Sequence, residues 1–220
     1  MQFLKKKREY AIKNILLLLL VTMFTFHASA SLLRNSQKYI SLDQPVTSMP
    51  HVLEFFSFYC PHCYEFEKEW CVNQTVQKNF PRHGKLIKYH IINFGGDMGY
   101  ALTRAWAIAM MMGVEEKAIL PIFEGVLVNK SIVDRVSLKK VFIQSTGIQA
   151  EQYDTAWNSQ VIDALCEQQG RVARNINLKG VPTIIIHGKY MVNGDKLDTS
   201  SIATYVQQYA DVVQFLLNKK

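Results

Sequence analysis

Four residues of the sequence, Cys60-Pro61-His62-Cys63, form a C-x-x-C motif that could carry out thiol–disulfide exchange. This chemistry needs two thiols that can bond to each other, and the attacking group is a thiolate. A histidine beside Cys60 can supply a positive charge or a hydrogen-bond donor, which lowers the pKa of the thiol. Because a stabilised thiolate favours the reduced pair, the oxidised pair would be a strong oxidant.

Two other interpretations of the motif are half of a zinc site and a structural disulfide without turnover. Zinc usually takes four ligands. The other cysteines, Cys71 and Cys166, do not form a second C-x-x-C, and the histidines at positions 51, 83, 90 and 187 show no ligand spacing. We therefore expect no metal site and no cofactor, and an inert disulfide is the weaker alternative.

The elements around the motif can position the two cysteines differently. Residues 51–59 are rich in β-branched and aromatic residues, which predicts a buried central strand. Residues 64–70 have helical composition, and Pro61 suits the first turn of a helix because its missing N–H is not needed there. Cys60 would then project from the helix N-terminus, where unpaired N–H groups favour a thiolate, and Cys63 would lie one turn inside.

The rest of the chain alternates between strand and helix patterns. The expected order is a second strand, a block of helices, a strand pair and a last amphipathic helix. The strands are predicted at residues 85–93, 181–186 and 189–192, and the helices at 100–112, 115–126, 138–145, 150–158, 160–174 and 199–217. This order predicts an α/β protein with a thioredoxin fold and an inserted all-helical domain. Residues 31–92 and 170–220 would form the thioredoxin-like domain, and residues 93–169 the insertion.

The N-terminus has the pattern of a secretory signal peptide. Basic residues precede an apolar run at residues 15–26, and small residues follow up to Ala30. The run is shorter than the ~20 residues that span a bilayer. We expect residues 1–30 to be a signal peptide cleaved after Ala30, and an uncleaved anchor is the alternative.

The charge of the exported part argues against nucleic-acid binding. The leader carries five basic residues and Glu9, a net +4 of the +7 of the whole chain, which leaves +3 for residues 31–220. We find no stripe of basic residues interleaved with aromatics in that part, so we expect no nucleic-acid partner. The aromatic and methionine residues at 106–112 have helical spacing, which favours core packing over a cofactor site.

Several segments of the sequence closely resemble the DsbA family. The resemblance covers nearly all of the exported chain and rests on Leu-Glu-Phe-Phe-Ser-Phe-Tyr-Cys-Pro-His-Cys-Tyr ending at Tyr64, Phe-Glu-Gly125, Ala-Trp-Asn158, Gly-Val-Pro182 and Val-Gln-Gln-Tyr-Ala-Asp211. It implies a thioredoxin fold with a helical insertion and net oxidase activity in the periplasm. The implied partners are exported proteins with reduced cysteines and a DsbB-type membrane oxidase linked to quinone.

The resemblance also assigns roles around the motif. Cys60 would be the exposed cysteine that is attacked, and Cys63 its buried partner. Val181-Pro182 would face the disulfide with a cis proline and pair its backbone with the substrate peptide; an ordinary strand start is the alternative. On resemblance alone, the groove for this peptide would be lined by Trp70, Val181 and Thr199.

Glu54 is a carboxylate within an otherwise apolar strand. Buried there, it must have a raised pKa or pair with a cation. The resemblance implies that Glu54 lies beneath the active site with Lys88 as its partner, where the two could move the proton of Cys63. Glu67, one turn after Cys63, is a weaker candidate for the same supporting role. The alternative is a solvated pair at a strand edge.

Cys71 and Cys166 depart from the best-known members of the family. Cys71 follows Cys63 by eight residues, which on a continuous helix means about 12 Å, too far for a disulfide that needs Cα atoms within about 7 Å. Cys166 shares one side of its helix with Ile162 and Gln169. We predict a structural Cys71–Cys166 disulfide that ties the insertion to the active-site helix, and two separate buried thiols are the alternative.

Together these features predict a thiol:disulfide interchange enzyme that works as a dithiol oxidase. We expect a monomer. Isomerases of this type usually add a dimerisation domain, and only about 10 residues separate Ser31 from the start of the fold, which argues against an isomerase. A reductase or isomerase of the same fold is the first alternative, and redox poise would distinguish it. A non-catalytic peptide-binding chaperone is the second, and it would not need Cys60.

Overall fold

The computed structural model describes residues 37–46, 51–78, 80, 84–92 and 95–219. The predicted leader and its cleavage site after Ala30 lie outside these residues. Residues Tyr39–Lys220 form one compact unit. Within the described part of the chain, no helix is long and apolar enough to cross a membrane.

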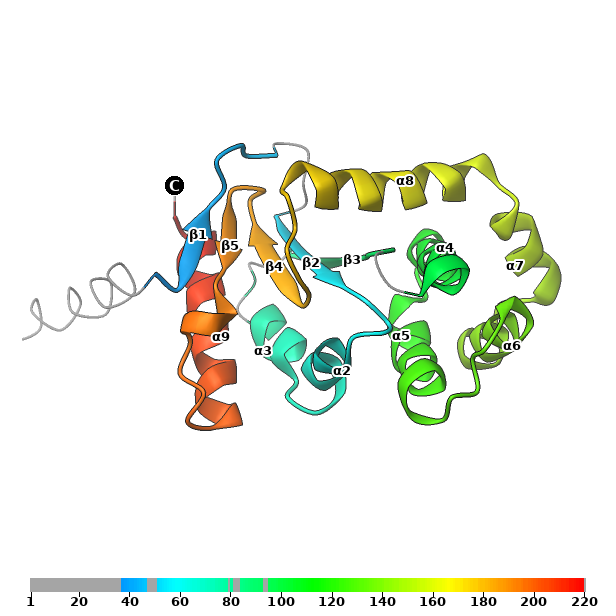
Figure 1. Ribbon diagram of the computed structural model, residues 1–220, viewed down its shortest axis with the longest axis horizontal. Coiled ribbons are helices and arrows are strands. Elements are labelled where there is room, and N and C mark those ends of the chain that lie inside the picture. The colour runs from blue at the N-terminus through cyan, green and yellow to red at the C-terminus, as the bar shows by residue number, and fades with distance from the viewer. Residues whose placement is uncertain (1–36, 47–50, 79, 81–83, 93–94, 220) are drawn as a thin grey trace, which may run out of the picture. The chain divides into compact units, whose positions relative to one another are not determined.

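A five-stranded mixed sheet forms the centre of this unit (Figure 1). Its spatial order is β1-β5-β4-β2-β3, in which β2 runs parallel to β3 and antiparallel to β4. All residues of the predicted central strand β2 are buried, as expected from its apolar sequence. The strands are β1 (Tyr39–Ser41), β2 (Val52–Phe56), β3 (Leu86–His90), β4 (Thr183–Ile186) and β5 (Tyr190–Val192).

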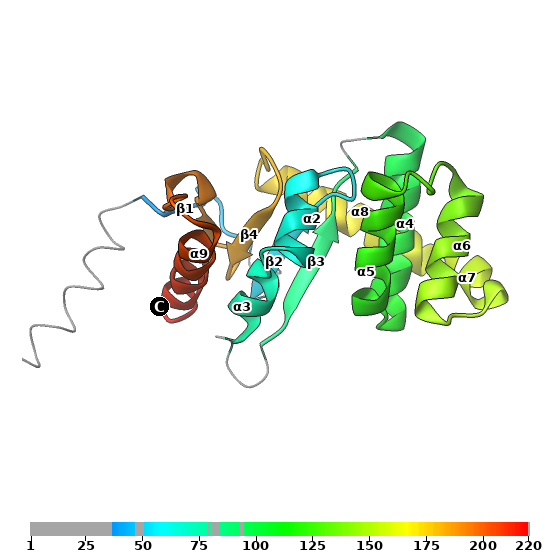
Figure 2. The same ribbon diagram turned by 90° about the horizontal axis from the view of Figure 1, so that it is seen from below.

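Helices cover both faces of the sheet (Figures 1 and 2). One face carries α2 (Pro61–Lys68), α3 (Val72–Lys78) and α9 (Ile202–Leu217), and the other carries α8 (Gln160–Asn175). Because successive side chains of a strand point to opposite faces, β2 contributes side chains to the packing on both faces of the sheet. Its Leu53 and Phe55 pack in one cluster with Val172 of α8, so Glu54 points toward the α2 and α3 side.

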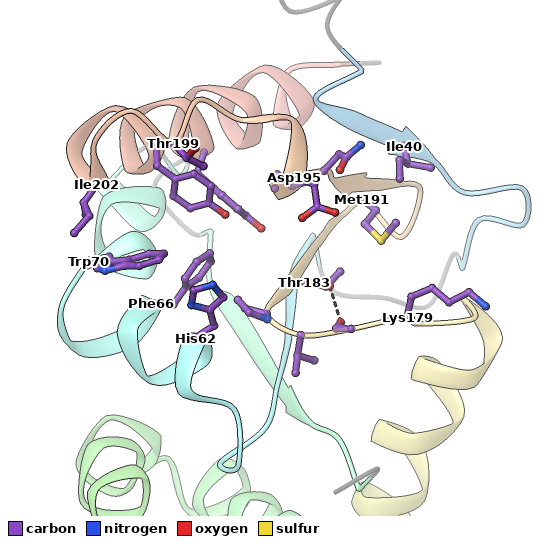
Figure 3. Close-up of a pocket in the computed structure, with 18 of the residues that line it drawn as sticks. Ile40, His62, Phe66, Trp70, Lys179, Thr183, Met191, Asp195, Thr199 and Ile202 are labelled. Carbon is purple, nitrogen blue, oxygen red and sulfur yellow. Dashed lines mark hydrogen bonds between the residues drawn. The ribbon is translucent and has the colours of Figure 1, made fainter. Parts of the chain in front are cut away.

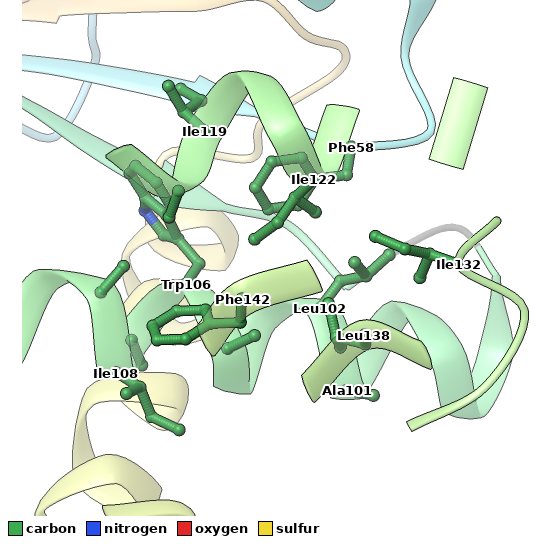
Figure 4. Close-up of a cluster of buried hydrophobic side chains, with 14 of the residues drawn as sticks. Phe58, Ala101, Leu102, Trp106, Ile108, Ile119, Ile122, Ile132, Leu138 and Phe142 are labelled. Carbon is green, nitrogen blue, oxygen red and sulfur yellow. The ribbon is translucent and has the colours of Figure 1, made fainter. Parts of the chain in front are cut away.

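The helical segment after β3 consists of α4 (Gly96–Met112), α5 (Glu115–Phe123), a π-helical turn (Glu124–Val128), α6 (Arg135–Thr146) and α7 (Ala150–Trp157). Its side chains form a large core around Trp106 and Phe142 (Figure 4). The core packing predicted for residues 106–112 is confirmed from Trp106 to Ala109, whereas Met111 is 42% exposed. The indole N–H of Trp106 donates to the Lys88 carbonyl at 2.8 Å and links this core to the sheet.

Several of the observed elements differ from the sequence predictions. The strand predicted from residue 181 begins at Thr183, and β1 and α3 were not predicted. The active-site helix ends at Lys68, and Cys71 adopts a left-handed conformation before α3 starts. Helix α8 runs through residue 170, so the boundary that we expected between insertion and second thioredoxin-like part falls inside one helix.

Candidate active site

The C-x-x-C motif lies at the junction between β2 and α2, as its sequence predicts. Cys60 is the N-cap residue of α2, and its Sγ accepts a hydrogen bond from the backbone N–H of Cys63 at 3.2 Å. Pro61 occupies the first helical position, where its missing N–H costs nothing. Both cysteines are free thiols, with Cys60 half-buried and Cys63 buried. An incoming thiol can therefore reach only the first sulfur of the pair.

The two thiols differ strongly in acidity. The pKa of Cys60 is lowered to about 7, first by a hydrogen bond from the Cys63 side chain and then by the Cys63 N–H and the charge of His62, against the opposing effect of partial burial. The pKa of Cys63 lies far above its usual range, because the thiol is buried and because it hydrogen-bonds to and is repelled by Cys60. Near neutral pH a large fraction of Cys60 in the reduced pair is therefore thiolate, whereas Cys63 stays protonated.

His62 lies on the solvent side of this pair. Its side chain is 67% exposed, and Nδ1 is 2.6 Å from a carboxylate oxygen of Glu65. The imidazole also meets the edge of Trp70, with ring centroids 5.3 Å apart. These two contacts hold the ring at the helix N-terminus, where a positive charge on it favours the Cys60 thiolate.

The loop before β4 faces Cys60 from the other side. The Val181-Pro182 peptide bond is cis, as the family resemblance implied. The carbonyl oxygen of Val181 is 3.5 Å from Cys60 Sγ and accepts its hydrogen bond. The helix start and the cis-proline loop therefore enclose the reactive sulfur.

Three charged side chains and one amide lie beneath the helix. Lys88 Nζ is 3.7 Å from Glu54 and also hydrogen-bonds to the carboxylate of Glu67, which accepts from Asn73 Nδ2 at 2.8 Å. Glu54 is 1% exposed, so the solvated strand-edge pair that we considered is wrong. Burial raises the pKa of Glu54 to about 7, against the opposing effect of Lys88. A charge on Glu54 also raises the pKa of Cys63, so the two groups lie near enough to interact electrostatically.

An open groove of about 720 Å³ extends from the motif along β5 and α9 (Figure 3). The predicted residues Trp70, Val181 and Thr199 all line it, together with His62 and Pro182. Its wall is more aromatic than we predicted: Phe66, Trp70, Tyr205 and Tyr209 form a chain of ring contacts. Tyr205 and Tyr209 are spaced one helical turn apart, a signal visible in the sequence of the last helix but not specific to a groove.

The predicted Cys71–Cys166 disulfide is not formed; both residues are free thiols. Cys71 lies just after α2, whereas Cys166 lies within α8 and is buried in the core of the helical segment. Cys166 is buried with Ile162 and Gln169, as its helical spacing predicts. The alternative of two separate cysteines describes them in this structure, although Cys71 is only half-buried.

Comparison with known proteins identifies the family. Residues 51–204 match the family described as the DSBA-like thioredoxin domain. The chain belongs to the DsbA family. It is 45% identical over 208 residues to the thiol:disulfide interchange protein DsbA of Salmonella typhi, across 94% of this chain and 100% of that protein. DsbA of Escherichia coli K12 matches with the same identity and coverage.

Solved structures of DsbA proteins agree with this assignment. Proteus mirabilis DsbA, a cysteine-to-serine variant with the non-covalently bound peptide PWATCDS, superimposes with a TM-score of 0.78 at 41% identity, covering 83% of this chain and 96% of that one. SrgA of Salmonella enterica serovar Typhimurium has a TM-score of 0.78 at 32% identity, with 81% and 98% covered. The fold class that we predicted is confirmed, and the chain is a DsbA-type disulfide oxidoreductase.

Proposed function

We propose that this DsbA-family protein is a periplasmic dithiol oxidase that donates the Cys60–Cys63 disulfide to newly exported proteins. The observation that carries this proposal is the asymmetry of the pair. The accessible Cys60 has a pKa lowered to about 7, whereas the buried Cys63 has a strongly raised one. A pair whose reduced form contains a stabilised thiolate gives up its disulfide readily.

The reaction consists of two exchange steps. A substrate thiolate attacks Cys60 Sγ of the oxidised pair, the Cys60–Cys63 bond breaks, and Cys63 leaves with the electron pair of that bond. A second thiolate of the substrate then attacks the substrate sulfur of the mixed disulfide, and Cys60 leaves as a thiolate. The substrate loses two electrons and two protons, and the pair becomes a dithiol. The low pKa of Cys60 makes it a good leaving group in the second step.

Glu54 is suited to supply the proton that Cys63 needs when it leaves. A thiol with a strongly raised pKa must be protonated quickly, and no bulk water reaches a side chain that is only 2% exposed. The pKa of Glu54, about 7, allows this carboxyl to give and take up a proton near neutral pH. Lys88 and Glu67 position the carboxyl beneath the thiol, as positioning residues.

The groove and the cis-proline loop would hold an extended peptide of the substrate beside Cys60. The loop carbonyl of Val181 already lies against the Cys60 sulfur. Proteus mirabilis DsbA has been solved with a bound peptide that contains a cysteine. We extend peptide binding to this chain, with Trp70, Val181 and Thr199 as contact residues.

Each catalytic cycle leaves the pair reduced, so the protein needs an electron acceptor. We propose a DsbB-type membrane oxidase linked to quinone as this acceptor. The chain would act as a monomer in the periplasm, after removal of the signal peptide behind Ala30. Reoxidation of the purified reduced protein by membranes that contain such an oxidase, but not by membranes that lack it, would test the partner.

The central experiment mixes the oxidised protein with a reduced dithiol peptide at equal concentrations. We expect the peptide to be oxidised while Cys60 and Cys63 become reactive toward an alkylating reagent. Cys60→Ser should abolish the transfer, and Cys71→Ser should leave it unchanged. A Cys60→Ser protein that still oxidises the peptide would overturn the proposal.

Equilibration with glutathione distinguishes an oxidase from a reductase. It should leave the Cys60–Cys63 pair largely reduced; a pair that stays oxidised would indicate a reductase instead.

A further inference from the structure

The turn that carries Cys60 is held by a buried histidine that has no part in the exchange chemistry. We propose that His90 is a positioning residue that anchors this turn and thereby makes the Cys60–Cys63 pair a stronger oxidant. The inference rests on the proposed function, because it concerns the strength of the same redox pair.

His90 is the last residue of β3 and is completely buried. Its Nε2 lies 3.1 Å from the backbone N of Phe58, and its Nδ1 lies 2.7 Å from the hydroxyl of Thr103. The Thr103 hydroxyl donates its own hydrogen to the carbonyl of Gly99 at 3.0 Å. Nδ1 must therefore carry the proton and donate to Thr103, while Nε2 accepts from Phe58. The contacts allow only this neutral tautomer.

The surroundings of His90 favour the neutral ring and keep it in place. Phe58 stacks on the imidazole, with ring centroids 5.1 Å apart, and Phe56 meets it edge-on. The backbone N–H of His90 donates to Gln169 of α8 at 2.8 Å. Burial lowers the pKa of His90 to about 3, so the ring remains an acceptor for Phe58 throughout the pH range in which Cys60 titrates.

The turn from Ser57 to Cys60 depends on an acceptor outside itself. The N–H of Tyr59 donates to the Ser57 hydroxyl at 3.2 Å, and the N–H of Cys60 donates to the Ser57 carbonyl at 3.0 Å. Both of these bonds lie within the turn. The N–H of Phe58 instead reaches His90, so this bond fixes the turn to β3 and, through Thr103, to α4.

Displacement of the turn would act directly on the Cys60 sulfur. The thiolate is stabilised by the Cys63 N–H at 3.2 Å and by the Cys63 thiol, and these interactions weaken as the distances grow. A buried Phe58 N–H without an acceptor is costly, so the turn would move to find another partner. Such a movement would reduce the stabilisation of the thiolate and with it the oxidising strength of the pair.

The test compares three variants by thiolate absorbance titration and by equilibration with glutathione. His90→Phe keeps the ring packing but removes the acceptor; we expect the pKa of Cys60 to rise by about one unit and the pair to become about tenfold less oxidising. His90→Gln can offer an amide oxygen to the Phe58 N–H, so its Cys60 pKa and its oxidising strength should lie much closer to those of the unmodified protein. Phe142→Leu, a buried change in α6, should lower stability while leaving Cys60 unchanged.

An unchanged Cys60 titration in His90→Phe would overturn the inference, as would an equal shift in Phe142→Leu. If His90→Phe does not fold, nitrogen NMR of the His90 ring in the unmodified protein still tests the inference. We expect protonated Nδ1 and no titration of His90 while Cys60 titrates; a proton on Nε2 would overturn the inference. A wild-type protein that cannot oxidise the dithiol peptide would instead refute the proposed function, so the two failures are distinguishable.

Discussion

The sulfur of Cys60 lies 3.5 Å from the carbonyl oxygen of Val181, 121 residues further along the chain. Cys63, one helical turn away, is buried beneath it. A peptide that pairs with the backbone of the cis-proline loop would therefore bring its own cysteine to Cys60 and not to Cys63. Under the proposed mechanism, this geometry favours Cys60 as the sulfur that forms the mixed disulfide.

Removal of the buried cysteine should trap that intermediate. We expect Cys63→Ala, incubated with a disulfide-containing peptide, to accumulate a mixed disulfide. The Cys60 thiolate attacks one sulfur of the peptide disulfide, the other peptide sulfur leaves as a thiolate, and Cys63 is no longer there to resolve the new bond. Non-reducing mass spectrometry should locate the bond at Cys60. The double variant Cys63→Ala, Cys71→Ser should give the same yield. A peptide bound through Cys71 would contradict the assignment of Cys60 as the exchanging residue.

The charge of His62 should contribute only modestly to the acidity of Cys60. Replacement by serine should raise the pKa of Cys60 above about 7. We expect a rise of at most about half a unit, because solvent screens a charge on so exposed a side chain. Thiolate absorbance measured against pH checks the shift. Glu65→Gln, which removes the neighbouring negative charge, should not raise the pKa of Cys60. If His62→Ser leaves the pKa of Cys60 unchanged, the proposed charge effect is excluded.

The raised pKa of Glu54 should make stability depend on pH. The carboxyl titrates near 4.5 when unfolded and at about 7 when folded, so the folded state binds the proton more tightly. The free energy of unfolding should therefore fall as the pH rises from about 4.5 to about 7, by on the order of 3 kcal/mol. Urea unfolding of the reduced protein across this range measures the slope.

Glu54→Gln should remove most of this slope and stabilise the protein above pH 7, because the amide is never charged. The exposed Glu116→Gln is the matched control and should leave the slope unchanged. A wild-type profile that is flat between these pH values would show that Glu54 is not buried as a proton-binding group.

Lys88 should stabilise the two carboxylates that it contacts. In Lys88→Met, Glu54 and Glu67 would face each other without a cation, and the pKa of Glu54 should rise further, since Lys88 is the main influence that lowers it. Breaking a buried pair from one side is costly, and we expect a loss of about 3 kcal/mol at neutral pH. The loss should shrink at pH 5, where Glu54 is protonated. Equal losses at both pH values would indicate lost packing instead of lost charge.

The sequence predicts those parts of the site that depend on local rules. The breaker-free apolar strand, Pro61 in the first turn and the spacing of the two cysteines suffice to place Cys60 at the helix start and Cys63 inside. Glu54 was also recognisable, because a carboxylate in a buried strand needs a partner. Its pairing with Lys88 was implied only by the family resemblance, and the parallel register of β2 and β3 places the two residues opposite each other.

Features that depend on long-range packing could not be predicted in this way. The break after Lys68 leaves Cys71 in a left-handed conformation, although nothing in residues 69–71 is a typical helix stop. The aromatic wall joins Phe66 and Trp70 to residues of the last helix, and its sequence pattern is that of any amphipathic helix. The acceptor role of His90 depends on the position of Thr103, which only the packing of α4 against β3 determines.

The two additional cysteines should behave as independent thiols. Both are free thiols, Cys71 after α2 and Cys166 in the core of the helical segment, so we expect digestion of the unreduced protein to yield no peptide that links them. The half-buried Cys71 should be alkylated in the native protein, whereas Cys166 is buried, its pKa is raised to about 11, and it should react only after unfolding. Cys71→Ser should therefore change the melting temperature by little. The double variant Cys71→Ser, Cys166→Ala should lower the melting temperature by no more than Cys166→Ala alone. A linked peptide, or a loss in Cys71→Ser as large as that in Cys166→Ala, would show that a bridge forms in the oxidised protein.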